Sequence, residues 1–392
     1  MGILAWFHPA VLTEYALGLG VRVRRSARGQ RRHRGTAGDI VHACVDACWN
    51  GRWYVASPGH FRQFWTRDLA FAAPALGRSS KRDRARVRAS LESALDVWIR
   101  RRSHVTTTIH SLDHPGDAFA FGVDSVPLLL AALRAIGADD HVDRHRSWLA
   151  DEVAHYCAVV VDPSTGLVRA DRTFSAHRDT VVSGSTAYAN SMVALLGKTL
   201  AETGWVASPL ARFFEPDPGR LLRERFWRGD RFIDTLDSDR TSGEANIWPF
   251  WTGVLGDREM LGRALATLTR EGFADPLPLR YETTRRPERE VWVTRHLLPN
   301  YQGSTIWTSI GSMYLWLLHR LDPPAAEAGI RGYSDWIRRD GTFWEVLDED
   351  GRCWVSPRRV FIGEESMLWG AIFLDLVEHP DLEPPLLSPP PT

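Results

Sequence analysis

The sequence contains little that would cross-link the protein or fix it in a membrane. Only four of its 392 residues are cysteine: Cys44, Cys48, Cys157 and Cys353. Four are too few for a disulfide framework in a chain of this length, and their spacing matches no zinc-binding pattern. No segment approaches the roughly 20 consecutive apolar residues that a membrane-spanning helix needs. We therefore expect a protein of the reducing cytoplasm.

An excess of charge of one sign is also absent. The 48 basic residues are matched by 48 acidic ones, so the net charge is zero. Such a chain has no overall field that would draw it to nucleic acid or to an anionic membrane, and we expect neither as a partner. Lysine is rare as well, since only Lys81 and Lys198 interrupt an otherwise arginine-based set of cations.

Tryptophan, by contrast, is abundant, with 17 residues. Two interpretations are open at this point. The rings can fill a large helical core, or some of them can stack on the flat face of a ligand.

The apolar pattern predicts an all-α protein. Apolar residues recur three and four positions apart, as on one face of a helix, in the segments Leu69–Leu76, Leu91–Trp98, Leu128–Ile136, Met192–Leu200 and Ile310–Leu317. Residues 22–35 carry seven arginines, and residues 383–392 carry five prolines. We predict three parts: an N-terminal segment with an arginine-rich tether (1–35), a helical body (36–378) and a proline-rich tail (379–392).

The first segment that suggests chemistry is Phe64–Asp68, at the start of a predicted helix. Trp65, Arg67 and Asp68 together supply an aromatic face, a fork of N–H donors and a charged acceptor, which are the groups that sugar hydroxyls require. Asp68 alone has a simpler explanation, since carboxylates are common at helix starts.

The second segment is Phe121–Pro127, which opens another predicted helix. Asp124 can be a helix cap or a general acid. The helix dipole would lower the pKa of a capping aspartate, so an acid at this position would need burial and a second carboxylate nearby.

Two later segments combine polar and aromatic residues. The loop before Trp307 contains Asn300, Tyr301 and Gln302, which suit a sugar subsite or an ordinary helix start. Residues 343–354 read as a short hairpin that turns at Asp350-Gly351, with Trp344 beside Glu345. Glu345 is either an exposed hairpin residue or a base activated by its aromatic neighbours.

These four segments, in this order, resemble the six-hairpin (α/α)6 glycosidases, especially the alkaline/neutral invertases and the α-glucosidase I and mannosylglycerate hydrolase group. Residues 64–68 are similar to the family's W-x-R-D motif, and residues 121–127 to its V-D-S and G-M-D-N-S-P motifs. Residues 300–307 are similar to N-Y-H-N-G-G-x-W, and residues 343–351 to W-P-E-Y-Y-D-x-x-x-G. The resemblance implies an (α/α)6 barrel with short β-hairpins at its mouth.

The resemblance also implies a glycoside hydrolase without a cofactor or metal, acting on an α-linked small saccharide. It assigns the acid role to Asp124 and the base role to Glu345, in an α-glucosidase-like, inverting reaction. Substrate contacts would come from Trp65, Arg67, Asp68, Asn300, Tyr301, Gln302, Trp307 and Trp344.

Several alternatives stay open. Asp117, Glu244, Glu364 and Glu365 compete for the two carboxylate roles. The same barrel serves sugar 2-epimerases that use histidines, for which His60, His110 or His319 would matter. A carbohydrate-binding protein without catalysis is also possible. His104, His110 and His114 lie close in sequence, but they match no metal-binding motif.

Overall fold

A computed structural model describes residues 29–383, together with Pro9, Thr13, Ala16, Gly18, Gly20, Val21, Val23, Arg25 and Ala27. Most of residues 1–21, four positions of the arginine-rich stretch (22, 24, 26 and 28) and the proline-rich tail beyond Glu383 therefore lie outside the described residues. The division into three parts stays a prediction.

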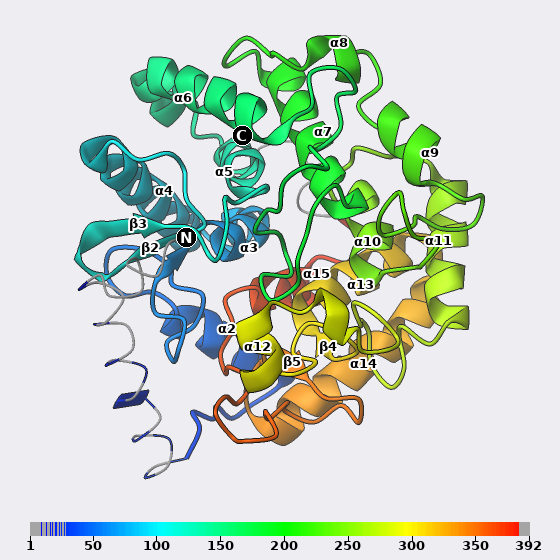
Figure 1. Ribbon diagram of the computed structural model, residues 1–392. Helices are drawn as coiled ribbons and strands as arrows, with labels where there is room; N and C mark the ends of the chain where they lie inside the picture. The colour runs from blue at the N-terminus through cyan, green and yellow to red at the C-terminus, as the bar shows by residue number, and fades with distance from the viewer. Residues whose placement is uncertain are drawn as a thin grey trace.

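The fold is a closed double ring of helices (Figure 1). Within the described chain, six helices pack side by side in a closed inner ring, each touching the next and the last touching the first. In order they are α3 (Thr66–Ser79), α5 (Ser125–Ala135), α7 (Ala187–Thr203), α10 (Gly243–Trp251), α13 (Thr308–Leu321) and α15 (Gly370–Glu378).

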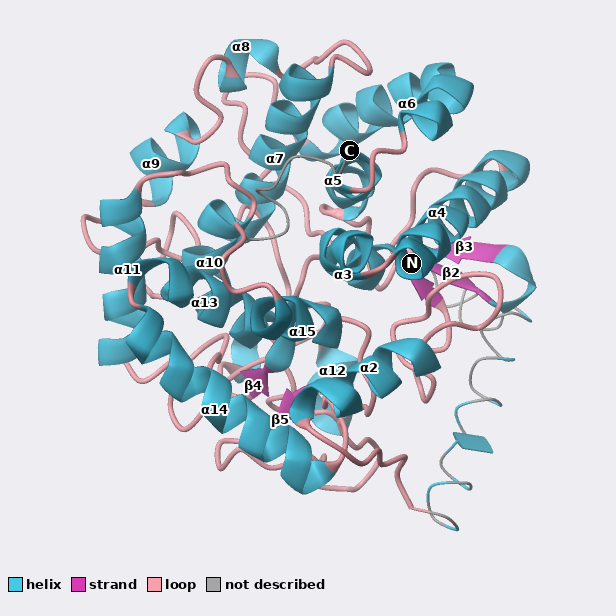
Figure 2. Ribbon diagram, turned by 180° about the vertical axis from the view of Figure 1, so that it is seen from behind, coloured by secondary structure: helices cyan, strands magenta, loops and turns pink. Residues whose placement is uncertain are grey.

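Outer helices pack against this ring, and all of them except α2 lie between successive inner helices along the chain (Figure 2). They are α2 (Ala37–Ala47), α4 (Lys81–Arg101), α6 (Asp139–Val160), α8 (Ala211–Phe214), α9 (Arg220–Phe226), α11 (Arg258–Arg270) and α14 (Pro323–Asp340). The short α12 (Trp292–Leu297) lies outside this alternation. The all-α prediction and the predicted (α/α)6 architecture are confirmed, and each of the five predicted helices falls on an observed one.

Local sequence explains where these helices begin and end. Thr36 caps α2 in a reciprocal capping box with Asp39, and Ser80 accepts a hydrogen bond from Asp83 N at the start of α4. Gly204 ends α7 in the left-handed conformation that glycine adopts without strain. Caps of this kind satisfy the free backbone groups at helix ends.

The strands are short and lie in the loops. β1 (Phe64–Trp65), β2 (Thr108–His110) and β3 (His114–Gly116) form one antiparallel sheet. β4 (Ile306–Trp307) pairs with β5 (Val346–Leu347), and Leu347 also bridges to Cys353 across a turn that includes Gly351 at φ 74°. The predicted hairpin is therefore present, and β4–β5 pairing ties it to the Trp307 loop.

Most of the tryptophan content belongs to the core. Trp98, Trp248, Trp251 and Trp316 are each less than 2% exposed. The Trp98 indole N–H donates to Thr106 Oγ1 at 3.0 Å, and that of Trp316 donates to Ile372 O at 3.1 Å. Within the described residues, no helix combines the length and the apolar character needed to span a bilayer.

Tight packing between α13 and its neighbours predicts a stability difference between two helical glycines. A Cβ at Gly311 would lie 1.9 Å from the Tyr333 hydroxyl and 2.3 Å from the Pro278 carbonyl oxygen. At Gly262 in α11, the nearest atom would be 3.9 Å away. We expect Gly311→Ala to lower the free energy of unfolding by about 1–3 kcal/mol, and Gly262→Ala to raise it by up to about 1 kcal/mol. Urea denaturation measures the free energy of unfolding of both variants. Equal changes in the two variants would contradict the close packing at Gly311.

Candidate active site

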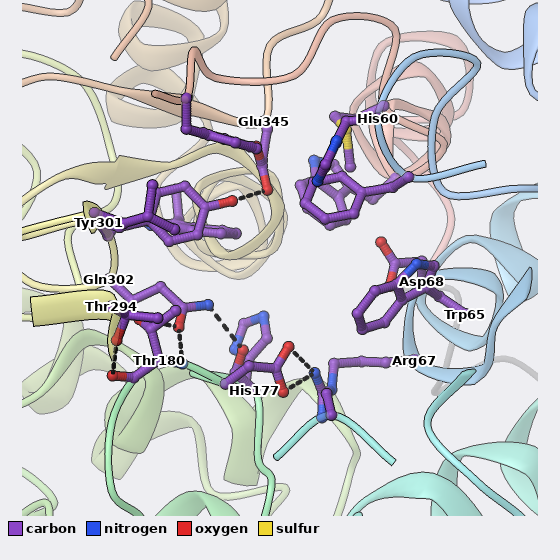
Figure 3. Close-up of a pocket in the computed structure, with 18 of the residues that line it drawn as sticks. His60, Trp65, Arg67, Asp68, His177, Thr180, Thr294, Tyr301, Gln302 and Glu345 are labelled. Carbon is purple, nitrogen blue, oxygen red and sulfur yellow. Dashed lines mark hydrogen bonds and ion pairs between the residues drawn. The ribbon is translucent and has the colours of Figure 1, made fainter. Parts of the chain in front are cut away.

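One cavity of about 210 Å³ lies where the loops of the barrel meet (Figure 3). It is smaller than the roughly 300–1,000 Å³ typical of pockets for drug-sized ligands, and its volume suits a single sugar ring. Its walls combine apolar rings with a few polar groups. The lining residues used below are His60, Trp65, Arg67, Asp68, Phe71, His177, Asp179, Tyr301, Gln302, Trp307, Glu345, Phe361 and Trp369.

Arg67 and Asp68 reach the cavity because α3 begins there. Trp65 ends β1, and the Thr66 hydroxyl donates to Thr106 O at 2.7 Å, which fixes the first helical turn. Trp65, Arg67 and Asp68, all predicted from the sequence, line the cavity. The three residues therefore come together as the motif suggested.

Asp124 does not line the cavity, although it is close to it in the fold. It occupies the N-cap position of α5 but makes no cap hydrogen bond. Its carboxylate, fully buried, accepts two hydrogen bonds from Arg67, at 2.7 and 3.1 Å, and one from the Tyr188 hydroxyl at 2.5 Å. Asp124 is therefore a buried partner of Arg67.

Asp179 is the carboxylate on the Arg67 side of the cavity. Arg67 Nη1 lies 3.0 and 3.1 Å from its two oxygens, and the Ser175 hydroxyl donates to it at 2.7 Å. Its side chain keeps 18% exposure. Burial raises the pKa of Asp179, while Arg67 and Ser175 oppose that rise. No motif of the sequence marks this residue, because the Arg-Asp dipeptide at 178–179 also occurs at 67–68, 82–83 and 339–340.

Glu345 lies across the cavity from Arg67, just before β5 (Figure 3). The Tyr301 hydroxyl donates to Glu345 Oε1, and Glu364 N donates to Oε2 at 3.1 Å. Burial raises the pKa of Glu345 to about 8, and these two donors oppose the rise because they stabilise the ionised form. Two carboxylates, Asp179 and Glu345, thus reach one cavity from different sides.

A third carboxylate, Asp68, also points into the cavity (Figure 3). Its residue is 7% exposed, and burial raises its pKa to about 7. No other described side chain donates a hydrogen bond to it. Its oxygens are therefore available to accept hydrogen bonds from a hydroxylated ligand.

Of the remaining substrate contacts predicted from the sequence, two residues line the cavity and two lie outside its lining. Gln302 lines the cavity, where its Oε1 accepts from Thr180 N and the Thr180 hydroxyl, both at 2.8 Å. Trp307 lines the cavity too. Asn300 does not: it adopts φ 65° and bonds Ser304 within its own turn. Trp344 also lies outside the wall, with its N–H on Asp340.

A buried charge cluster supports the Asp179 segment from behind. Arg178, 1% exposed, binds Glu244 and Glu282, each at 2.7 Å, and Asp234 at 3.2 Å. Arg178 is not among the residues that line the cavity, whereas the adjacent Asp179 is. Glu244 is therefore part of this support.

The other carboxylates considered from the sequence have structural partners. Asp117 accepts from Thr107 N at 2.9 Å and lies 2.8 Å from His104 Nε2. Arg25 pairs with both Glu364 and Glu365. Among the residues that the structure describes, no group of three or more His, Cys, Asp or Glu is placed to hold a metal ion.

The comparisons identify the class of fold. No protein-family model matches the sequence, and no curated protein is significantly similar to it in sequence. Solved structures do match: the chain has the fold of the six-hairpin glycosidases.

Three of these structures are informative. A glycosidase in complex with glucose has a TM-score of 0.61 at 15% identity, over 89% of this chain and 97% of its own. A rhamnosidase from Klebsiella oxytoca with rhamnose bound has a TM-score of 0.62 at 14% identity, over 88% and 63%. The GH63 mannosylglycerate hydrolase from Thermus thermophilus, in complex with Tris and D-glycerate, has a TM-score of 0.53 at 14% identity, over 88% and 100%.

The Arg178 cluster predicts a large cost of removing its cation. Arg178→Met would remove the cation that three buried carboxylates share, although Asp234 keeps its ion pair with Arg289, and we expect a loss of about 3–5 kcal/mol in the free energy of unfolding. The matched control is Arg263→Met, since the Arg263 side chain is 55% exposed and its contacts, an ion pair with Glu259 and a hydrogen bond to Gly229 O at 3.2 Å, lie at the surface. Its loss should stay below about 1 kcal/mol. Urea denaturation at neutral pH compares the two, and a small effect at Arg178 would exclude this role.

Proposed function

We propose that this protein is a glycoside hydrolase that removes one terminal sugar from a small α-linked glycoside. The observation that carries the proposal is the pair Asp179 and Glu345, a half-buried and a buried carboxylate that reach the same sugar-sized cavity from different sides. Glycosidic bonds are broken by such a pair, in which one group gives a proton and the other takes one.

Asp179, in place of Asp124, is the proposed general acid. A general acid must touch the leaving oxygen. Asp179 lines the cavity, whereas Asp124 is 0% exposed and lies behind Arg67. Since Arg67 is shared between two carboxylates, its charge stabilises the ionised form of Asp179 less than an exclusive ion pair would.

Glu345 is the proposed general base, as the resemblance implies. Tyr301 and the Glu364 amide both donate to its oxygens and so orient it as an acceptor. A carboxylate with a raised pKa is also a stronger base toward water once it is ionised. The inverting outcome and the α-glucosidase-like preference follow from the resemblance and are part of the proposal.

The cavity chemistry favours hydrolysis over the epimerase alternative. Of the three histidines named from the sequence, His60 lines the cavity, where its ring packs edge to face on Phe61 and Phe361, whereas His110 and His319 do not line it. His177 does, but its nitrogens lie 3.4 Å from Trp248 Nε1 and 3.2 Å from the Tyr281 hydroxyl, inside a cage of aromatic rings. A cytoplasmic location is part of the same proposal, supported by four free cysteines.

The first experiment is hydrolysis of a panel of glycosides, with wild type beside Asp179→Asn and Glu345→Gln. The panel contains maltose, isomaltose, trehalose, sucrose, glucosylglycerate, mannosylglycerate and an aryl α-rhamnoside. We expect one sugar to be released with inverted configuration at its anomeric carbon. NMR spectra recorded during the reaction identify the anomer that is released. Each variant should lose about 10²- to 10⁴-fold in kcat, since general acid and general base assistance are each of that size.

A glycosyl fluoride separates the roles of Asp179 and Asp124, because fluoride leaves with little help from an acid. Asp179→Asn should regain much of its rate on the fluoride, whereas Asp124→Asn should be slowed alike on both substrates. If the fluoride restores the rate of Asp124→Asn and not that of Asp179→Asn, Asp124 would be the general acid. An absence of cleavage by wild type across the panel would exclude the hydrolase.

The pH dependence of kcat/KM tests the role of Glu345. A base must be ionised, so activity should rise with pH through an apparent pKa near 8. Tyr301→Phe removes a donor that stabilises the ionised form, so this limb should move to higher pH. Tyr281→Phe is the matched control, because its hydroxyl bonds His177 and not Glu345. Activity that instead falls with pH near 8 would make Glu345 the acid.

A further inference from the structure

A second and larger cavity lies beside the sugar-sized one. Its volume is about 790 Å³. His60 and Phe361 line both cavities, and their rings meet edge to face with centroids 5.4 Å apart. The two cavities therefore adjoin at these two side chains.

The second cavity is basic, in a protein whose net charge is zero. Arg25, Arg32 and Arg359 line it, and none of the described lining residues is acidic. Arg25 is held by Glu364 and Glu365, which lie behind the lining, yet its buried Nε has no hydrogen-bond partner among the described residues. A buried donor of this kind is costly unless an acceptor binds it.

One turn carries residues of both cavities. Val355 bridges to Ile362, and within this pair Ser356 N donates to Phe361 O at 2.9 Å while Arg359 N donates to Ser356 O at 2.7 Å. Arg359 adopts φ 53°, a left-handed conformation that is uncommon for a residue with a side chain. The turn thus places Arg359 in the basic cavity and Phe361 in the wall shared with the sugar-sized cavity.

We propose that the substrate carries an anionic group, a carboxylate or a phosphate, that binds in the basic cavity while its sugar occupies the adjoining one. The inference rests on the proposed function and specifies its substrate class. Guanidinium groups match carboxylate and phosphate geometry with paired, charge-assisted hydrogen bonds. The anionic group can belong to the leaving group or to the sugar itself, and the two sources are distinguished below.

The test compares matched pairs of substrates that differ by one anionic group. α-Glucosylglycerol and α-glucosylglycerate place the difference in the leaving group, and nitrophenyl α-glucoside and α-glucuronide place it on the sugar. The same pairs are made for whichever sugar the panel identifies. The test variant is the double substitution Arg32→Gln/Arg359→Asn. Asparagine is chosen at position 359 because it tolerates the left-handed conformation of that residue. Arg358→Gln is the matched control, an exposed neighbour that does not line the cavity.

For one of the two pairs, we expect wild type to have a kcat/KM at least about tenfold higher for the anionic member. The double variant should lose most of this preference and cleave the neutral member as wild type does, while Arg358→Gln should change neither. Equal rates on both members of each pair would overturn the anionic subsite and leave the hydrolase intact.

If no glycoside is cleaved, calorimetric measurement of the binding of glycerate, glycerol 2-phosphate and glycerol tests the anionic subsite without catalysis. Binding of either anion but not of glycerol, lost in the double variant, would support the basic site in spite of a failed hydrolase. The two anions also distinguish a carboxylate from a phosphate ligand. If neither anion binds, or if binding is unchanged in the double variant, the proposed anionic subsite would be overturned.

Discussion

The site depends on a single buried guanidinium, that of Arg67. It binds Asp124 through Nε and Nη2 and Asp179 through Nη1, so one cation holds two carboxylates in fixed positions. Burying such groups is favourable only when each charge is paired and hydrogen-bonded. The pairing explains why Arg67, at 4% exposure, can open a helix at the edge of a cavity.

The closed ring of helices is what brings distant segments to this guanidinium and its cavity. The cavity is lined by the first turns of α3 and by segments that connect later inner helices, so residues from His60 to Trp369 share one wall. The aromatic core keeps the ring rigid, with four tryptophans almost wholly buried. A rigid scaffold matters because a misplacement of about 1 Å in a reacting group can cost two orders of magnitude in rate.

The sequence predicts the architecture well because helical periodicity and the order of the four motifs are local signals. Trp65, Arg67, Asp68, Tyr301, Gln302, Trp307 and Glu345 line the cavity as those motifs suggested. Asp124 and Asp179 show what such local signals do not predict. Asp124 stands at a helix start, but its side chain is turned to Arg67, and that pairing between distant residues has no local signature. Asp179 lies in an aperiodic loop, held in place by a charge cluster assembled from three other segments.

The charges around the cavity also explain why carboxylates there can hold protons at neutral pH. Asp68, Asp179 and Glu345 line the cavity, and Glu364 N donates to Glu345. Among the described residues, the cations that form ion pairs with these four groups are Arg67, which binds Asp179, and Arg25, which binds Glu364. Arg67 is already shared with Asp124. Burial therefore acts on a set of groups with too few counter-charges, and it raises the pKa of Asp68 and Glu364 to about 7 and that of Glu345 to about 8. Groups so close titrate together, and each proton that one of them binds relieves the others. Acid and base catalysis of glycoside cleavage requires one protonated and one ionised carboxyl, so the proposed base Glu345 must lose its proton while another group of this set keeps one.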